Sequence, residues 1–178
     1  MYIQILMLML SMTPQQNSDF QLDFNLTDKG YSYVNEPLPK GIQVVKEDGQ
    51  GHILEVNTPT LIQVWSQCCG GDAEQWAHQR YTEFHFKDKG LRVVSINFEN
   101  GKSQQQQKQM MQEFFKVNDK PSEWYIDPLG WAYDALRVKS FPTYILVSKE
   151  GTIIFKTAGK STEGVALLDK EIKKLLGI

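Results

Sequence analysis

Apolar and polar positions alternate along the chain in a way that predicts an α/β domain. Short β-prone apolar runs predict strands, at 20–26, 42–45, 52–56, 61–65, 91–98, 122–126, 144–148 and 152–156. Apolar residues at helical spacing predict helices, at 72–87, 103–117, 131–136 and 162–176. Strands that alternate with helices and end in a hairpin plus a helix favour a mixed sheet with helices on both faces.

The same spacing predicts which faces of two helices are buried. In the helix at 72–87, the expected buried residues are Ala73, Trp76, Ala77, Tyr81 and Phe84. In the helix at 103–117, the expected apolar face consists of Met110, Met111, Phe114 and Phe115. The glutamine run at 104–107 is expected to face solvent, because a polar run within a helix usually forms its solvated side.

An apolar segment, 1–19, precedes the predicted domain and ends in a polar linker. We place the domain at 20–178. The apolar run of the segment, 3–12, is about as long as the core of an export signal, but no basic residue precedes it and no small-x-small pattern follows. The run is too short to span a bilayer as a helix. We favour a degraded or mis-started export signal, and with it a periplasmic or otherwise exported protein. The alternative is an ordinary apolar element of a cytoplasmic protein.

Composition and charge narrow the class of partner. The 178 residues are 41% hydrophobic and 22% charged, which suits one globular domain with a core of normal size. The formal net charge is −2, and the lysines are scattered along the chain. Neither a nucleic acid nor an acidic membrane surface is therefore an expected partner, because both attract a concentrated basic patch.

The candidate chemistry lies in the segment 60–76. A β-prone run ends at two adjacent cysteines, Cys68 and Cys69, which are followed by Gly70, Gly71 and the predicted start of a helix. At such a strand-to-helix turn, free backbone N–H groups and the helix dipole stabilise a thiolate. The two adjacent cysteines exclude a disulfide framework, but they can form a vicinal disulfide, bridge to another chain or stay free.

A metal site has weaker support. The three histidines are His52, His78 and His85, and none lies at a short metal-motif spacing from the cysteines. We therefore expect neither a metal nor a cofactor.

The order of these features resembles the thioredoxin superfamily, and most closely its TlpA/ResA-like thiol–disulfide oxidoreductase branch. The motifs that carry the resemblance are Trp65-x-x-Cys68-Cys69-Gly70-Gly71-Asp72, Asp127-Pro128-x-Gly130, Val138-x-x-Phe141-Pro142-Thr143 and the Gly151 hairpin. In that branch, a helix and a strand are inserted before the proline loop, and an extra hairpin precedes the central strand. The resemblance covers residue 20 to the C-terminus, and it implies a thioredoxin-like fold with an N-terminal β-hairpin extension.

The resemblance also implies roles for the residues around the cysteines. Trp65 matches the family's tryptophan four positions before the reactive cysteine, which makes Cys69 the candidate nucleophile. Cys68 stands where the family usually has a second tryptophan. Gly70 and Gly71 occupy the two variable positions between the family's paired cysteines.

Two positions depart from the family pattern. Asp72 stands where the resolving cysteine is expected, and a dithiol cycle needs that second thiol to release the mixed disulfide. Gln63 stands where classical thioredoxins bury a proton-accepting carboxylate, and a neutral amide cannot accept the proton.

Pro142 matches the proline whose peptide bond, here Phe141–Pro142, is cis in the family and lies against the active-site cysteine.

Two functions fit these residues. In the first, a monothiol-type oxidoreductase, Cys69 attacks a disulfide of a protein or small molecule, and an external thiol or Cys68 resolves the product. In the second, the fold has lost catalysis and holds an extended peptide or partner in the groove beside Pro142. The substrate-binding residues expected in either case are Trp65, Gly70, Gly71, Phe141 and Pro142.

Overall fold

The computed structural model describes residues 34–70, 73–159 and 162–178, which belong to one compact unit, Ser32–Ile178. Some expectations from the sequence lie outside these residues, namely the apolar run 3–12, the strand 20–26, and positions Gly71 and Asp72. The side chains of Cys69, Gly70 and Ala73 are also outside the description.

A seven-stranded sheet of order β2-β1-β5-β4-β3-β6-β7 forms the centre of this unit. The strands are β1 (Gln43–Val45), β2 (Gly51–Ile53), β3 (Thr60–Trp65), β4 (Arg92–Asn97), β5 (Trp124–Ile126), β6 (Thr143–Val147) and β7 (Ile153–Ala158). The strands β3, β4 and β5 are parallel, whereas every other neighbouring pair is antiparallel. The mixed direction predicted from the alternation of strands and helices is therefore confirmed.

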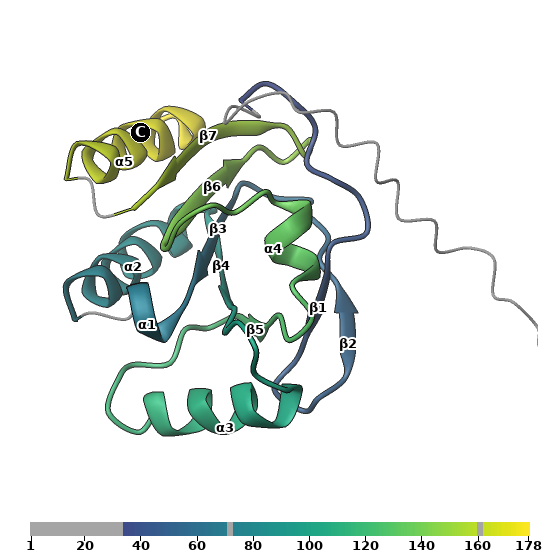
Figure 1. Ribbon diagram of the computed structural model, residues 1–178. Coiled ribbons are helices and arrows are strands. Elements are labelled where there is room, and N and C mark those ends of the chain that lie inside the picture. Colours follow the sequence, from purple (N-terminus) through teal and green to yellow (C-terminus); the bar gives the residue numbers. More distant parts are fainter. Residues whose placement is uncertain (1–33, 71–72, 160–161) are drawn as a thin grey trace, which may run out of the picture. The chain divides into compact units, whose positions relative to one another are not determined.

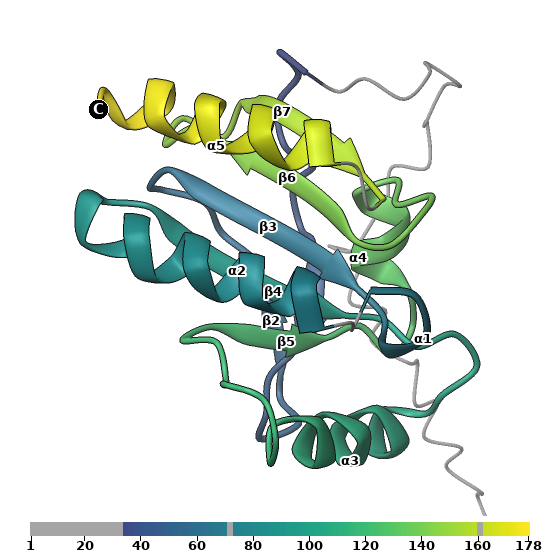
Figure 2. The ribbon, with the colours of Figure 1, turned by 90° about the vertical axis from the view of Figure 1, so that its left-hand side faces the viewer.

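Helices cover both faces of this sheet. They are α1 (Gln67–Gly70), α2 (Ala73–Phe86), the 3₁₀ helix η1 (Lys87–Lys89), α3 (Gln104–Phe114), α4 (Trp131–Ala135) and α5 (Thr162–Leu176). Figures 1 and 2 show α2 and α5 on one face of the sheet and α4 on the other. None of the helices in the described ranges is both long and apolar enough to cross a membrane.

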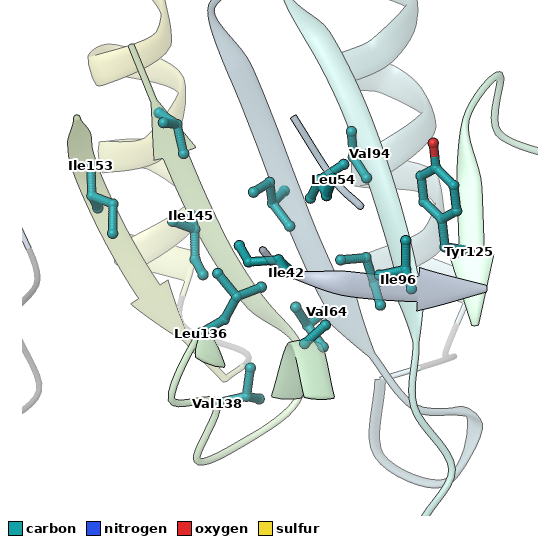
Figure 3. Close-up of a cluster of buried hydrophobic side chains, with 14 residues drawn as sticks. Ile42, Leu54, Val64, Val94, Ile96, Tyr125, Leu136, Val138, Ile145 and Ile153 are labelled. Carbon is teal, nitrogen blue, oxygen red and sulfur yellow. The ribbon is translucent and has the colours of Figure 1, made fainter. Parts of the chain in front are cut away.

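The two faces of the sheet follow the period-two alternation of the strands. On the α4 face, side chains such as Ile62 and Val64 of β3 join a large buried cluster with Leu136 (Figure 3). On the other face, Leu61 packs in a second cluster with Leu168 of α5. All six residues of β3 are buried, which explains why this strand is a nearly continuous apolar run in the sequence.

The buried face of α2 differs from the predicted one. Trp76 is buried as expected, but Ala77, Tyr81 and Phe84 are exposed, Tyr81 by 46% and Phe84 by 81%. Trp76 packs against Trp65 with ring centroids 5.0 Å apart. This contact is consistent with a helix that is rotated about its own axis relative to the predicted orientation. Among the described side chains of α2, Gln79, Thr82, Glu83 and Phe86 are buried as well.

Candidate functional site

Both cysteines lie in α1, a single helical turn that directly follows β3 and Ser66. The sequence predicted them in a turn ahead of the helix, but the helical structure begins one residue before Cys68. Cys68 is exposed and disulfide-bonded, and Cys69 is the only other cysteine of the chain. Of the three states left open by the sequence, the structure thus contains Cys68 in its oxidised form.

The proline loop lies at the same end of the sheet as α1. Thr143 pairs with Val64 in antiparallel register, so Pro142 lies beside the end of β3 where α1 begins. The Phe141–Pro142 peptide bond is cis, the form that the family resemblance implies. Pro142 is buried, and its carbonyl accepts a hydrogen bond from the Gly159 N–H at 2.8 Å.

Trp65 does not line this site, which corrects its assignment as a substrate-binding residue. Its side chain is 1% exposed and lies in a core cluster with Trp76 of α2 and Trp124 of β5. Its indole Nε1 donates a hydrogen bond to Ser95 Oγ at 2.8 Å. Trp65 therefore supports the end of β3 from the interior of the protein and cannot contact a substrate.

A buried carboxylate that the sequence did not single out lies beside α1. Glu99 is 7% exposed, and its Oε2 accepts a hydrogen bond from Ser66 Oγ at 2.8 Å. Its Oε1 accepts from the Gln67 backbone N–H at 2.6 Å and from Asn97 Nδ2 at 3.0 Å. Ser66 Oγ lies 3.2 Å from Cys68 Sγ, so the carboxylate is one hydroxyl away from a cysteine sulfur.

The sequence does contain a signal for this carboxylate. The strands β3 and β4 are parallel, so residues that follow both strands meet at one edge of the sheet. Glu99 comes two residues after β4, and Ser66 comes directly after β3. An acidic residue at this edge of the sheet was therefore a candidate.

Gln107 holds the backbone of the Glu99 loop, which corrects the expectation that the glutamine run faces solvent. Its side chain is fully buried, and its Nε2 donates to the carbonyls of Glu99 at 3.1 Å and Lys102 at 3.3 Å. Gln104 and Gln105 are exposed as expected. Ser103 is the N-cap of α3, and its side chain and that of Gln106 form a capping box that fixes the first turn of the helix.

Three half-buried aromatic side chains lie next to the proline loop. Phe98 and Tyr133 stack with centroids 4.7 Å apart, and Phe141 lies 6.2 Å from Phe98 and 5.9 Å from Tyr133. We call these three residues the aromatic cluster. Each is partly exposed, so the cluster offers an apolar surface beside Pro142.

Asp127 positions one member of the aromatic cluster. Its carboxylate Oδ2 accepts a hydrogen bond from the Tyr133 backbone N–H at 2.8 Å, and burial raises the pKa of this carboxyl group above its ordinary value. Gly130 has φ +74, and a Cβ there would lie 3.4 Å from Phe98. The Asp127-Pro128-x-Gly130 motif thus fits a tight turn under the aromatic cluster.

Lys156 of β7 secures the segment that leads into the proline loop. Its Nζ donates to the carbonyls of Leu136 at 2.8 Å and Arg137 at 3.1 Å, which directly follow α4. Burial lowers the pKa of Lys156 to about 8, and the positive charges of Arg137 and Lys139 contribute to this shift. The lysine thus carries a partly desolvated ammonium group.

Gln63 lies in the interior, where the family resemblance placed it. It is 1% exposed and pairs with Ser95 on β4 and Tyr144 on β6. Its side-chain amide makes no hydrogen bond to the described residues. The described residues contain no cluster of three or more histidine, cysteine, aspartate or glutamate side chains that could hold a metal ion.

Comparisons with solved structures identify the fold. The chain is similar to a protein assigned as thiol:disulfide interchange protein DsbE from Chlorobium tepidum, with a TM-score of 0.69, 18% identity, and coverage of 81% of this chain and 98% of that chain. It is similar to StoA from Bacillus subtilis, with a TM-score of 0.56, 17% identity, and coverage of 72% of this chain and 92% of that chain. No family model and no curated protein matches the sequence.

A third similar structure is Etrx1, the pneumococcal exposed lipoprotein thioredoxin from Streptococcus pneumoniae strain TIGR4. Its TM-score is 0.58 at 18% identity, and the match covers 74% of this chain and 97% of that chain. The protein therefore has the thioredoxin-like fold, which confirms the predicted fold class. The insertion of α3 and β5 before the proline loop and the β1–β2 hairpin follow the arrangement that the TlpA/ResA-like resemblance implies.

Proposed function

We propose that this protein is a thiol–disulfide oxidoreductase in which Cys69 attacks a disulfide. The observation that carries this proposal is the meeting of α1, which contains both cysteines, with the cis Phe141–Pro142 loop at one edge of the sheet. The proposal is supported by the fold, which the chain shares with structures named as thiol:disulfide interchange and thioredoxin proteins.

The reaction starts with attack by the Cys69 thiolate on one sulfur of a substrate disulfide. The substrate S–S bond breaks, its other sulfur leaves with the electron pair as a thiolate, and a mixed disulfide remains on Cys69. Cys68 or an external thiol then attacks the Cys69 sulfur and releases the second substrate thiolate. The oxidised state of Cys68 supports its use in this second step, since Cys69 is the one other cysteine of the chain.

The substrate site in this proposal is the surface beside Pro142. The aromatic cluster offers apolar contact for the side chains that flank a substrate cysteine. The substrates are accordingly protein or small-molecule disulfides.

We also propose that the protein acts outside the cytoplasm. The similar structure from Streptococcus pneumoniae is named as an exposed lipoprotein, which agrees with this location.

Turnover of a disulfide substrate tests the proposal. The rate of reduction of a disulfide probe that releases a coloured thiol is measured with a dithiol reductant for the wild type, Cys69→Ser and Cys68→Ser. We expect Cys69→Ser to lose the protein-dependent rate and Cys68→Ser to keep part of it, because an external thiol can replace Cys68. Unchanged turnover in Cys69→Ser would overturn the proposed role of Cys69. A wild type without any protein-dependent turnover would overturn the proposal and favour an inactive binding module that holds a peptide beside Pro142.

A further inference from the structure

We infer that Glu99 and Ser66 form a proton relay for Cys68. The relay consists of Cys68 Sγ, Ser66 Oγ at 3.2 Å from it, and Glu99 Oε2 at 2.8 Å from the hydroxyl. The inference rests on the proposed function for its place in turnover, but the relay itself is defined by these contacts. It assigns a positioning role to Ser66 and a proton-transfer role to Glu99.

The donors and acceptors fix the direction of the relay. Ser66 has a single hydroxyl hydrogen, and it donates this hydrogen in a hydrogen bond to the Glu99 carboxylate. Cys68 Sγ is disulfide-bonded in the structure and lies 3.2 Å from Ser66 Oγ. Once the disulfide is reduced, the Cys68 thiol can donate to a free lone pair of Ser66 Oγ. The network therefore fits reduced Cys68 as a neutral thiol, and it disfavours the thiolate.

Glu99 is held in one orientation for this task. Its second oxygen accepts from the Gln67 N–H and from Asn97 Nδ2, while Gln107 holds its backbone carbonyl. The carboxylate is 7% exposed, so its hydrogen bonds are not replaced readily by water. Gln63 cannot supply the proton acceptor that classical thioredoxins place on this strand, and Glu99 provides a carboxylate from the neighbouring strand's end.

The other charged groups near this network are either exposed to solvent or bonded elsewhere. Lys102, on the loop before α3, and Glu113 of α3 line a hollow of about 380 Å³ together with Gln67. Both are exposed, so solvent screens their charges. Asp127 lies at the end of β5, where its carboxylate accepts from the Tyr133 N–H instead of facing α1. Among these described carboxylates, Glu99 is the one bonded to Ser66.

The relay acts when Cys68 resolves a mixed disulfide on Cys69. The Cys68 thiol passes its proton to Ser66, and Ser66 passes its own proton to Glu99. The Cys68 sulfur attacks Cys69 Sγ, the Cys69–substrate bond breaks, and the substrate leaves as a thiolate that is protonated by solvent. When a dithiol later donates two electrons and reduces the Cys68–Cys69 disulfide, Cys68 leaves as a thiolate and receives the proton back from Glu99 through Ser66.

Alkylation of Cys68 tests the relay without any turnover. In a Cys69→Ser background, the rate of reaction of Cys68 with iodoacetamide is followed by mass spectrometry across the pH range. We expect Glu99→Gln to lower the pH of half-maximal rate by about one unit, because the negative charge that opposes the thiolate is gone. We expect Ser66→Ala to lower it by less, and Ser66→Thr, which keeps the hydroxyl, to restore the value of the background.

The outcomes separate this inference from the proposed function. If Glu99→Gln and Ser66→Ala both fold and both keep the midpoint of the background, the relay is overturned, whether or not the protein turns over disulfides. If Glu99→Gln does not fold, the contrast between Ser66→Ala and Ser66→Thr decides the question alone. A shifted midpoint in a protein without turnover supports the relay and overturns the proposed function.

Discussion

Gln107 Nε2 donates a hydrogen bond to the backbone carbonyl of Glu99 at 3.1 Å. This contact joins α3, the helix inserted before the proline loop, to the loop that carries the buried carboxylate. The side chain of Gln107 is fully buried, so the hydrogen bond forms away from water. The inserted helix thus contributes to the candidate site by fixing the position of Glu99.

Gln107→Ala is expected to lower the free energy of unfolding by about 1 to 3 kcal/mol, because the buried Glu99 carbonyl and the partly buried Lys102 carbonyl each lose the hydrogen bond from Gln107 Nε2. Gln105→Ala, on the exposed side of the same helix, is the matched control and is expected to change stability by less than about 0.5 kcal/mol. Urea unfolding measures both variants. Equal stability of the two variants would mean that the Gln107 hydrogen bonds contribute nothing to the fold.

Lys156 is expected to make stability depend on pH on the alkaline side. Its pKa is about 8 in the folded protein, against an ordinary value of 10.5, so the unfolded chain binds more protons between these values. The free energy of unfolding therefore rises as the pH increases through this window. This rise in the free energy of unfolding is expected to end near pH 10. Burial raises the pKa of Tyr125 to about 12 from its ordinary value of 10.0, so the tyrosine ionises first in the unfolded chain and favours unfolding above that pH.

Lys156→Met is expected to flatten this rise when urea unfolding is compared at about pH 7.5 and about pH 9.5. Lys170→Met, at an exposed position of α5, is the control and is expected to keep the slope of the wild type. A Lys156→Met slope as steep as that of the wild type would show that another group causes the pH dependence.

Phe141→Ala is expected to raise KM for a disulfide-containing peptide several-fold, on the order of 1 kcal/mol of lost contact, with a smaller effect on kcat. The reason is that Phe141 belongs to the aromatic cluster beside Pro142 but carries no reacting group. Phe84→Ala removes an exposed aromatic side chain from α2 and serves as the control. Steady-state kinetics that give the same KM for both variants would place the peptide elsewhere.

Asp72→Cys is expected to raise the rate of protein disulfide reduction above that of the wild type by about tenfold or more. The substitution supplies a second thiol three positions after Cys69, the spacing of the family's paired cysteines, so that the mixed disulfide can be resolved within the chain. Insulin reduction with a dithiol reductant measures the gain. A variant that bonds Cys69 to the new thiol without gaining activity would show that the surroundings do not favour exchange.

The periodicity of the sequence predicted most elements of the described fold, but not the helical turn α1 that carries both cysteines. Helix α5 has the predicted bounds, Thr162–Leu176, since its apolar stripe repeats at helical spacing. The rotation of α2 was predicted wrongly, because Tyr81 and Phe84 satisfy the same spacing as Trp76. The choice between these faces involves the contact of Trp76 with Trp65, which is distant in sequence and cannot be derived from local periodicity.

The candidate site was predicted in part. The motifs placed Cys68, Cys69 and Pro142 at one edge of the sheet, because their order along the chain matches a known fold. Glu99 and Gln107 were missed, because a single glutamate in a loop and a glutamine in a polar run resemble ordinary surface residues. Their role comes from tertiary hydrogen bonds that join β4, α1 and α3.

In the proposed reaction, Cys69 attacks the substrate and Cys68 can resolve the product. The most direct measurement is mass spectrometry of Cys68→Ser and Cys69→Ser after each is mixed with a peptide that contains a disulfide. We predict a mixed disulfide that accumulates on Cys69 in Cys68→Ser, because the neighbouring thiol that would release it is absent, and little adduct in Cys69→Ser. Adduct formed mainly on Cys68 in Cys69→Ser, or none on Cys69 in Cys68→Ser, would contradict the account.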